Sequence, residues 1–202
     1  MKKLLLVALV CLGCAPIVAP TQTAVDPHKV FLVDGRFSKA EEKVIQNSIT
    51  EWITATGSPD TELYPLSYAM IEPSDSLDGD GINRIFLVSQ LDPSYDKTLK
   101  RAGLLEFHGL TTSYDDGSKS ITVVSEALSP IRINGKTYKV DLERLHFIML
   151  HELGHVFGLS HSSNTLMRAK GNMLNPCIDQ RALDVFCYIH ENCNAPHSTC
   201  EN

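Results

Sequence analysis

The chain has 202 residues, of which 43% are hydrophobic and 21% are charged, and its formal net charge is −6. This composition excludes a disordered, collagen-like or coiled-coil protein, and the length suits one domain or two small ones. Because no run of basic residues occurs, a nucleic-acid partner is not expected.

The N-terminus has the features of an export signal. A positive start (MKK) precedes residues 4–12, an apolar run that is too short to span a bilayer as a stable helix. Residues 11–14 (CLGC) resemble a bacterial lipobox, in which a small residue precedes a cysteine that becomes lipidated, although Cys11 stands where an aliphatic residue is usual. We therefore predict a signal peptide at residues 1–13 and a lipid anchor on Cys14 at the bacterial cell envelope. Secretion without lipid and an apolar N-terminal strand are the alternatives.

A tether and the first strand and helix follow the signal. Residues 14–29 are rich in proline, threonine and alanine and are expected to be the tether. Residues 29–34 (KVFLVD) predict a strand, because β-branched and apolar residues follow one another. Ser38 then begins a helix, since Glu41 lies three residues on and completes a capping box. The helix is expected to end at residues 57–59 (GSP).

Strand patterns fill the middle of the chain, and helical patterns follow. Strand or hairpin segments are predicted at residues 66–71, 82–88, 104–107, 121–124 and 131–140, the last with an Asn-Gly turn. Two helices are predicted, a long one at residues 141–157 and a last one at residues 178–189. The order strand, helix, several strands, helix, loop, helix predicts an α+β (mixed α/β) fold with one sheet.

The acidic turn at residues 78–81 (DGDG) invites a calcium interpretation. An EF-hand loop would place Ser76 at its first ligand position and Leu87 at its twelfth, and leucine has no oxygen to offer. A tight turn leading into the next strand is therefore the better interpretation. A calcium site of another kind stays open.

The stretch HELGHVFGLSH, which begins at His151, carries the clearest chemistry. On a helix, His151 and His155 are one turn apart, so both imidazoles project from one face and can bind one zinc ion. Glu152 is rotated by about 100° and lies beside the metal rather than on it. Gly158 can end the helix in a left-handed conformation and bring His161 to a third ligand position. Three protein ligands leave a fourth position for water, which marks a catalytic site.

This stretch has two alternative interpretations. The histidines could be ordinary polar residues of a helix, but they lie within the apolar run MLHELGHVFGL, where unliganded imidazoles and a carboxylate would be costly to bury. A zinc site without catalysis is the second alternative. A purely structural site needs no base, so Glu152 argues against it.

The stretch resembles the zinc-binding motif of the metzincin metallopeptidases, and the run HELGHVFGLSHSS is most similar to the matrixins. The first helix, with its apolar stripe and Trp52, and residues 179–186 (DQRALDVF) are also matrixin-like. The resemblance covers residues 29–190. It implies that residues 30–202 form one catalytic domain, with a twisted, mostly parallel sheet, an active-site helix, a methionine-containing turn (Met-turn) and a C-terminal helix.

The resemblance also implies roles for single residues. One catalytic Zn²⁺ ion would be held by the three histidines, and Glu152 would be the general base of an endopeptidase. Met167 is the first candidate for the Met-turn and Met173 the second, with core packing as the alternative for either. The second zinc site of the matrixins has no clear counterpart in this sequence. His108 and Asp115 are its only remnants, and both are better explained as surface or turn residues.

For the substrate, the resemblance implies a protein or peptide bound by a monomer. Residues 69–71 or 104–107 would supply the edge strand on which an extended peptide lies. Residues 168–176 would form the wall of the first primed-side pocket, where Arg168 and Lys170 are expected to be solvated surface charges. The alternatives are a hydrolase of cell-wall peptide crosslinks, which would suit a lipid-anchored protein, and a non-catalytic binding module with a zinc-stabilised core.

Four cysteines lie in the C-terminal part of the chain, namely Cys177, Cys187, Cys193 and Cys200. An even number in an exported chain predicts two disulfides, with three possible connectivities. A structural zinc site is the alternative, but the spacings lack the paired knuckles that such sites use. The bridges would tie down the C-terminal tail rather than the whole fold.

Overall fold

The structure is a computed structural model, which describes most of the chain from residue 29 onward. The described residues are 29–67, 81–102, 108–129, 131–133, 136–138, 141–168, 176–191, 193–194 and 196–200. Several predictions fall outside these ranges: the signal peptide, lipidation at Cys14, the tether up to residue 28, the acidic turn up to residue 80, the segments 69–71 and 104–107, Lys170 and Met173.

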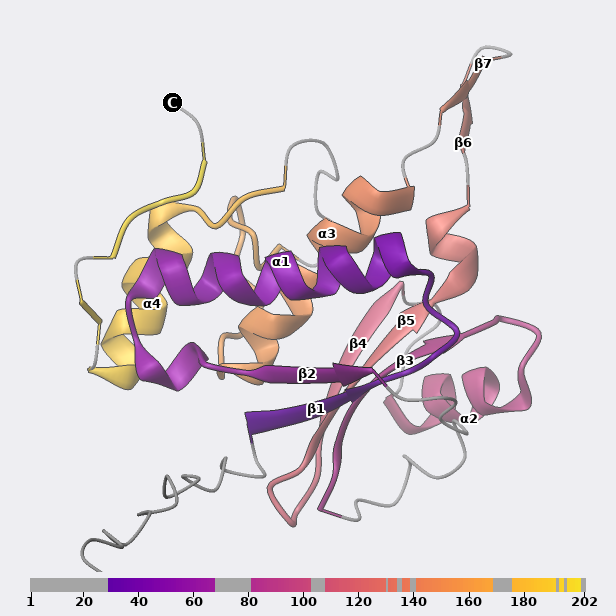
Figure 1. Cartoon of the computed structure of the whole chain (residues 1–202), viewed down its shortest axis with the longest axis horizontal. Helices are drawn as coiled ribbons and strands as arrows, with labels where there is room; N and C mark the ends of the chain where they lie inside the picture. Colours follow the sequence, from indigo (N-terminus) through magenta and orange to yellow (C-terminus); the bar gives the residue numbers. More distant parts are fainter. Residues whose placement is uncertain are drawn as a thin grey trace, which may run out of the picture.

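A five-stranded sheet in the order β2-β1-β3-β5-β4 forms the centre of the molecule (Figure 1). Its strands are β1 (Val30–Val33), β2 (Tyr64–Ser67), β3 (Asn83–Val88), β4 (Gly109–Ser113) and β5 (Lys119–Val124). Three of the four pairings are parallel, and only β4 runs antiparallel to its neighbour β5. The predicted mixed α/β fold with a mostly parallel sheet is therefore confirmed.

The predicted hairpin is present but does not join this sheet. The strands β6 (Ile131–Ile133) and β7 (Lys136–Tyr138) pair only with each other and project away from the body of the molecule (Figure 1). The expectation of one sheet is wrong on this point. A short hairpin can satisfy its own hydrogen bonds, so its sequence pattern does not say which sheet it joins.

Helix α1 (Lys39–Thr56) begins and ends as its sequence predicts. The Ser38 hydroxyl accepts a hydrogen bond from the Glu41 N–H at 3.3 Å, and the Glu41 carboxylate accepts one from the Ser38 N–H at 2.6 Å. Gly57 ends the helix with a φ of 57°, which glycine adopts without a steric penalty. The capping box is confirmed.

Trp52 connects α1 to the helix that carries the zinc motif. Its side chain is fully buried, and its indole N–H donates to the Leu150 carbonyl at 3.0 Å. Its ring also lies 5.4 Å from that of Phe157 and 5.9 Å from that of Phe186. One buried aromatic residue thus fixes α1 against α3 (Asp141–Val156) and α4 (Gln180–His190).

The remaining elements show where the sequence patterns were incomplete. Helix α2 (Pro93–Ala102) was not predicted, and strand β4 lies at Gly109–Ser113, where no strand was expected. Two short 3₁₀ turns, at Pro59–Thr61 and Ser125–Leu128, complete the described elements. None of the helices within the described residues has the length and apolar character that crossing a bilayer requires.

Candidate metal centre

Helix α3 and the turn after it bring three imidazoles to one point. His151 and His155 lie on α3, and Gly158, with a φ of 88°, turns the chain back so that His161 meets them. The Nε2 atom of His155 is 3.2 Å from that of His151 and 3.2 Å from that of His161, and the His151–His161 distance is 3.3 Å. Among the described residues, this is the group that could hold a metal ion.

Hydrogen bonds to Nδ1 determine that Nε2 of His151 and of His155 faces the centre of the three-histidine cluster. Nδ1 of His151 lies 2.9 Å from the Leu166 carbonyl, and Nδ1 of His155 lies 2.7 Å from the Leu159 carbonyl. A carbonyl can only accept, so each Nδ1 carries the proton and each neutral ring has its lone pair on Nε2. Two lone pairs that face each other at 3.2 Å repel unless a cation lies between them. The arrangement therefore fits a metal ion.

The charge state of the imidazoles also suits a metal. Burial lowers the pKa of His151 to about 4, and the neighbouring histidines act in the same direction. Burial lowers the pKa of His155 as well. Both rings are therefore neutral at pH 7, which is the form that binds metal.

Glu152 lies beside the three histidines, against strand β4. Its side chain is 4% exposed, and its Oε2 accepts a hydrogen bond from the Thr111 hydroxyl at 2.8 Å. A Cβ atom on Gly109 would lie 2.5 Å from Cγ2 of Ile148 and 2.8 Å from Oε1 of Glu152, so glycine at this position leaves room for both side chains. Burial raises the pKa of Glu152 to about 7, against the lowering effect of the Thr111 hydrogen bond. A carboxyl group with that pKa can exchange a proton near neutral pH.

Met167 lies directly beneath α3. Its side chain is 1% exposed, and its sulfur packs against the backbone of Gly154. The Met167 carbonyl accepts a hydrogen bond from the Ser162 N–H at 2.9 Å, which fixes the residue next to His161. The assignment of Met167 to the Met-turn stays a prediction.

Replacing Gly154 with alanine is expected to destabilise the fold by about 1–3 kcal/mol, the usual range for an overpacked core. An added Cβ would come closer than 3.0 Å to the sulfur of Met167, which is itself buried, so the methionine would have to shift within the core. Urea unfolding of the metal-free protein measures the change. Equal midpoints for Gly154→Ala and the parent would contradict this packing.

The two remnants of a second zinc site, His108 and Asp115, are exposed and lie outside this centre. His108 directly precedes β4, and Asp115 lies in the turn between β4 and β5. Neither belongs to a group of three or more candidate ligands within the described part of the chain. From the acidic turn, only Gly81 is described, and its N–H donates to the Asp116 carboxylate at 2.6 Å. Arg168 is half-buried at the end of the described turn.

Three residues near the centre were missed by sequence reasoning. Thr111 contacts Glu152 across 41 positions, Asp179 accepts from the Leu166 N–H at 2.5 Å, and Lys119 donates to the Val156 carbonyl at the end of α3. Burial lowers the pKa of Lys119. Of the three, only Asp179 carried a local signal, because it is the N-cap residue of α4.

The chain matches none of the protein-family models and none of the curated proteins in sequence. Among solved structures, it is similar to archaemetzincin from Methanopyrus kandleri, with 16% identity, a TM-score of 0.49, and coverage of 84% of this chain and 99% of that one. It is also similar to the GM1-bound form of the ECX AB5 holotoxin, with 12% identity, a TM-score of 0.38, and coverage of 82% and 72%.

Proposed function

We propose that the protein is a zinc-dependent endopeptidase, in which His151, His155 and His161 hold one zinc ion and Glu152 is the general base. The observation that carries this proposal is the convergence of three Nε2 atoms, two of which have their proton fixed on the opposite nitrogen. A zinc ion bound there would supply Lewis acidity, which polarises a carbonyl and acidifies water. A buried glutamate next to the ligands supports catalysis rather than a purely structural site.

The role of Glu152 follows from its burial and its pKa. A base is most useful when its pKa lies near the working pH, and burial holds that of Glu152 at about 7. We infer that Glu152 accepts a proton from the attacking water and delivers it to the leaving amine. The Thr111 hydroxyl orients the carboxylate for this transfer through Oε2.

Strand β4 is the proposed binding surface for the peptide substrate. It is the last strand of the five-stranded order, so its outer edge has no partner strand among the described residues. Glu152 packs against its Gly109 and Thr111, which brings that edge next to the metal ligands. An extended peptide could pair with such an edge by strand addition.

Export is part of the same proposal. The four C-terminal cysteines form two disulfides, Cys177–Cys200 and Cys187–Cys193, and disulfides persist in oxidising compartments. This pairing is one of the three that the sequence allowed. Lipid attachment at Cys14 to the bacterial envelope, secretion as the alternative, and a monomeric state are proposed from the sequence.

Digesting a denatured protein and purified cell wall side by side tests the proposal. We expect cleavage of the denatured protein, loss of this activity with a chelator and its return with added zinc, and no effect of serine-protease reagents. Release of wall peptides without cleavage of the denatured protein would indicate the wall hydrolase instead. Zinc binding without hydrolysis of either substrate would indicate the binding module.

A further inference from the structure

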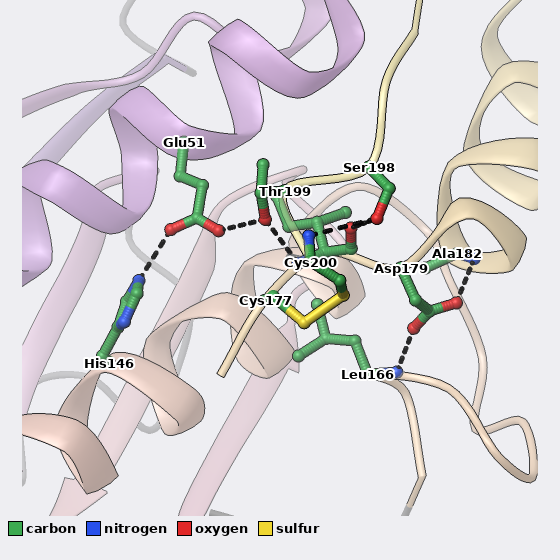
Figure 2. Close-up of a disulfide and its surroundings, with 10 residues drawn as sticks. Glu51, His146, Leu166, Cys177, Asp179, Ala182, Ser198, Thr199 and Cys200 are labelled. Atoms are coloured by element: carbon green, nitrogen blue, oxygen red, sulfur yellow. Dashed lines mark hydrogen bonds and ion pairs between the residues drawn. A yellow bond between two sulfur atoms is a disulfide. The ribbon is translucent and has the colours of Figure 1, made fainter. Parts of the chain in front are cut away.

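The end of the chain is bonded to the segment that leads into α4. We call residues 196–200 the C-terminal strap. The Cys177–Cys200 disulfide joins the strap to this segment, as Figure 2 shows. The Ile178 N–H donates to the Thr199 hydroxyl at 2.8 Å, and the Thr199 N–H donates to the Ile178 carbonyl at 3.0 Å. Both backbone groups of Ile178, whose side chain is fully buried, are therefore held by the strap.

The strap is hydrogen-bonded to helix α1, and through Glu51 of α1 it is linked to helix α3. The Thr199 hydroxyl donates to the Glu51 carboxylate on α1, and the other oxygen of that carboxylate lies 2.8 Å from Nε2 of His146 on α3 (Figure 2). The His197 N–H also donates to the Ala55 carbonyl at 2.9 Å. The strap therefore gives the Cys177 segment a fixed position relative to α1 and α3.

Asp179 connects the Cys177 segment to the turn that follows α3 and carries His161 (residues 157–168), which we call the metal-binding turn. One of its carboxylate oxygens accepts from the Ala182 N–H at 3.0 Å and caps α4. The other accepts from the Leu166 N–H at 2.5 Å (Figure 2). The carbonyl of the same Leu166 holds Nδ1 of His151 at 2.9 Å. A continuous path of bonds thus runs from the disulfide through Asp179 and Leu166 to His151.

We propose that Asp179, held in place by the Cys177–Cys200 disulfide, is a positioning residue that sets the metal affinity of the three-histidine site. It touches neither metal nor substrate. It fixes the Leu166 carbonyl, which in turn fixes the proton and the orientation of the His151 ring. The inference rests on the metal site of the proposed function and is independent of hydrolysis.

The second disulfide provides a matched control. Cys187–Cys193 joins the end of α4 to the start of the tail, with a sequence separation of 6. The path from the strap to His151 does not pass through it. Removing either disulfide takes away one covalent link near the C-terminus. Only Cys177–Cys200, however, is connected to the metal-binding turn, through the hydrogen bond between Asp179 and Leu166.

The zinc dissociation constant, measured by competition with a chromogenic chelator, tests the inference. Asp179→Asn keeps a good N-cap for α4 but replaces one carboxylate acceptor with an amide. We expect its affinity for zinc to fall about tenfold, at the lower end of the range for groups that orient metal ligands. Cys177→Ser/Cys200→Ser is expected to show a similar loss. Cys187→Ser/Cys193→Ser, and Ser38→Ala at the cap of α1, should stay within about twofold of the parent.

The outcomes separate this inference from the proposed function. Parental zinc affinity in Asp179→Asn, or an equal loss in the control variants, overturns the inference even if the parent is an active peptidase. A tenfold loss in a parent that hydrolyses nothing supports the inference and contradicts the peptidase. Circular dichroism of the metal-free proteins checks folding. If Cys177→Ser/Cys200→Ser does not fold, the zinc affinity of Asp179→Asn, which keeps both disulfides, is the measurement that decides the inference.

Discussion

Glu152→Gln is expected to lower kcat/KM for a peptide substrate at least about 100-fold while one zinc ion per chain stays bound. A positioned general base contributes about 10²–10⁴-fold, and glutamine keeps the size of the side chain but cannot accept the proton. The three histidines are unchanged, and the Thr111 hydroxyl can still donate to the amide oxygen. Cleavage rates and metal analysis of the same preparation measure both quantities.

Glu143→Gln is the matched control for this experiment. Glu143 is an exposed glutamate of the same helix, about two and a half turns before Glu152. It should keep the parental kcat/KM. If Glu152→Gln retained near-parental turnover with zinc in place, the assignment of the base would be wrong, although the metal site would stand.

His155→Ala is expected to abolish zinc binding and activity together. The substitution removes one of three proposed ligands, and two imidazoles alone do not complete a catalytic zinc site. The Leu159 carbonyl also loses its imidazole partner, so the turn that carries His161 loses a contact. Zinc content after dialysis and peptide cleavage are the measurements.

His108→Ala serves as the control and also tests the second zinc site. His108 is an exposed histidine outside the cluster, so its removal should leave one zinc ion per chain and the parental rate. Retention of zinc by His155→Ala would refute the ligand assignment, and with it the resemblance to the metzincins. Two zinc ions in the parent and one in His108→Ala would show that the remnant site is functional.

The parts of the fold that the sequence predicted correctly are those with local causes. The capping box at Ser38 and Glu41 involves groups three residues apart, and the spacing of His151 and His155 follows from one turn of helix. The left-handed turn at Gly158 is local as well. Short-range geometry was enough to predict that the three histidines can meet.

The parts that escaped prediction depend on contacts between distant residues. Strand β4 begins with a glycine, a poor strand former, and the side chains of Ile148 and Glu152 occupy the space that a Cβ would need there. The disulfide pairing depends on where the strap lies against α1, which cysteine spacing does not reveal. Helix α2 is an exception, because its mostly polar sequence, PSYDKTLKRA, repeats apolar residues at helical spacing (Tyr95, Leu99 and Ala102). A helix could therefore have been predicted there from local pattern.

The C-terminal strap also determines when the fold can be completed during synthesis. The carbonyls of Ala55 and Thr56, at the end of α1, accept from the N–H groups of His197 and Asn194, and Thr199 bonds Glu51 across 148 positions. Helix α1 is made early, yet its last carbonyls find these partners only after residues 194–199 have left the ribosome. Contacts of such long sequence separation form late and slowly. The bonds that hold the strap against α1 can therefore form only after residues 194–199 have been synthesised.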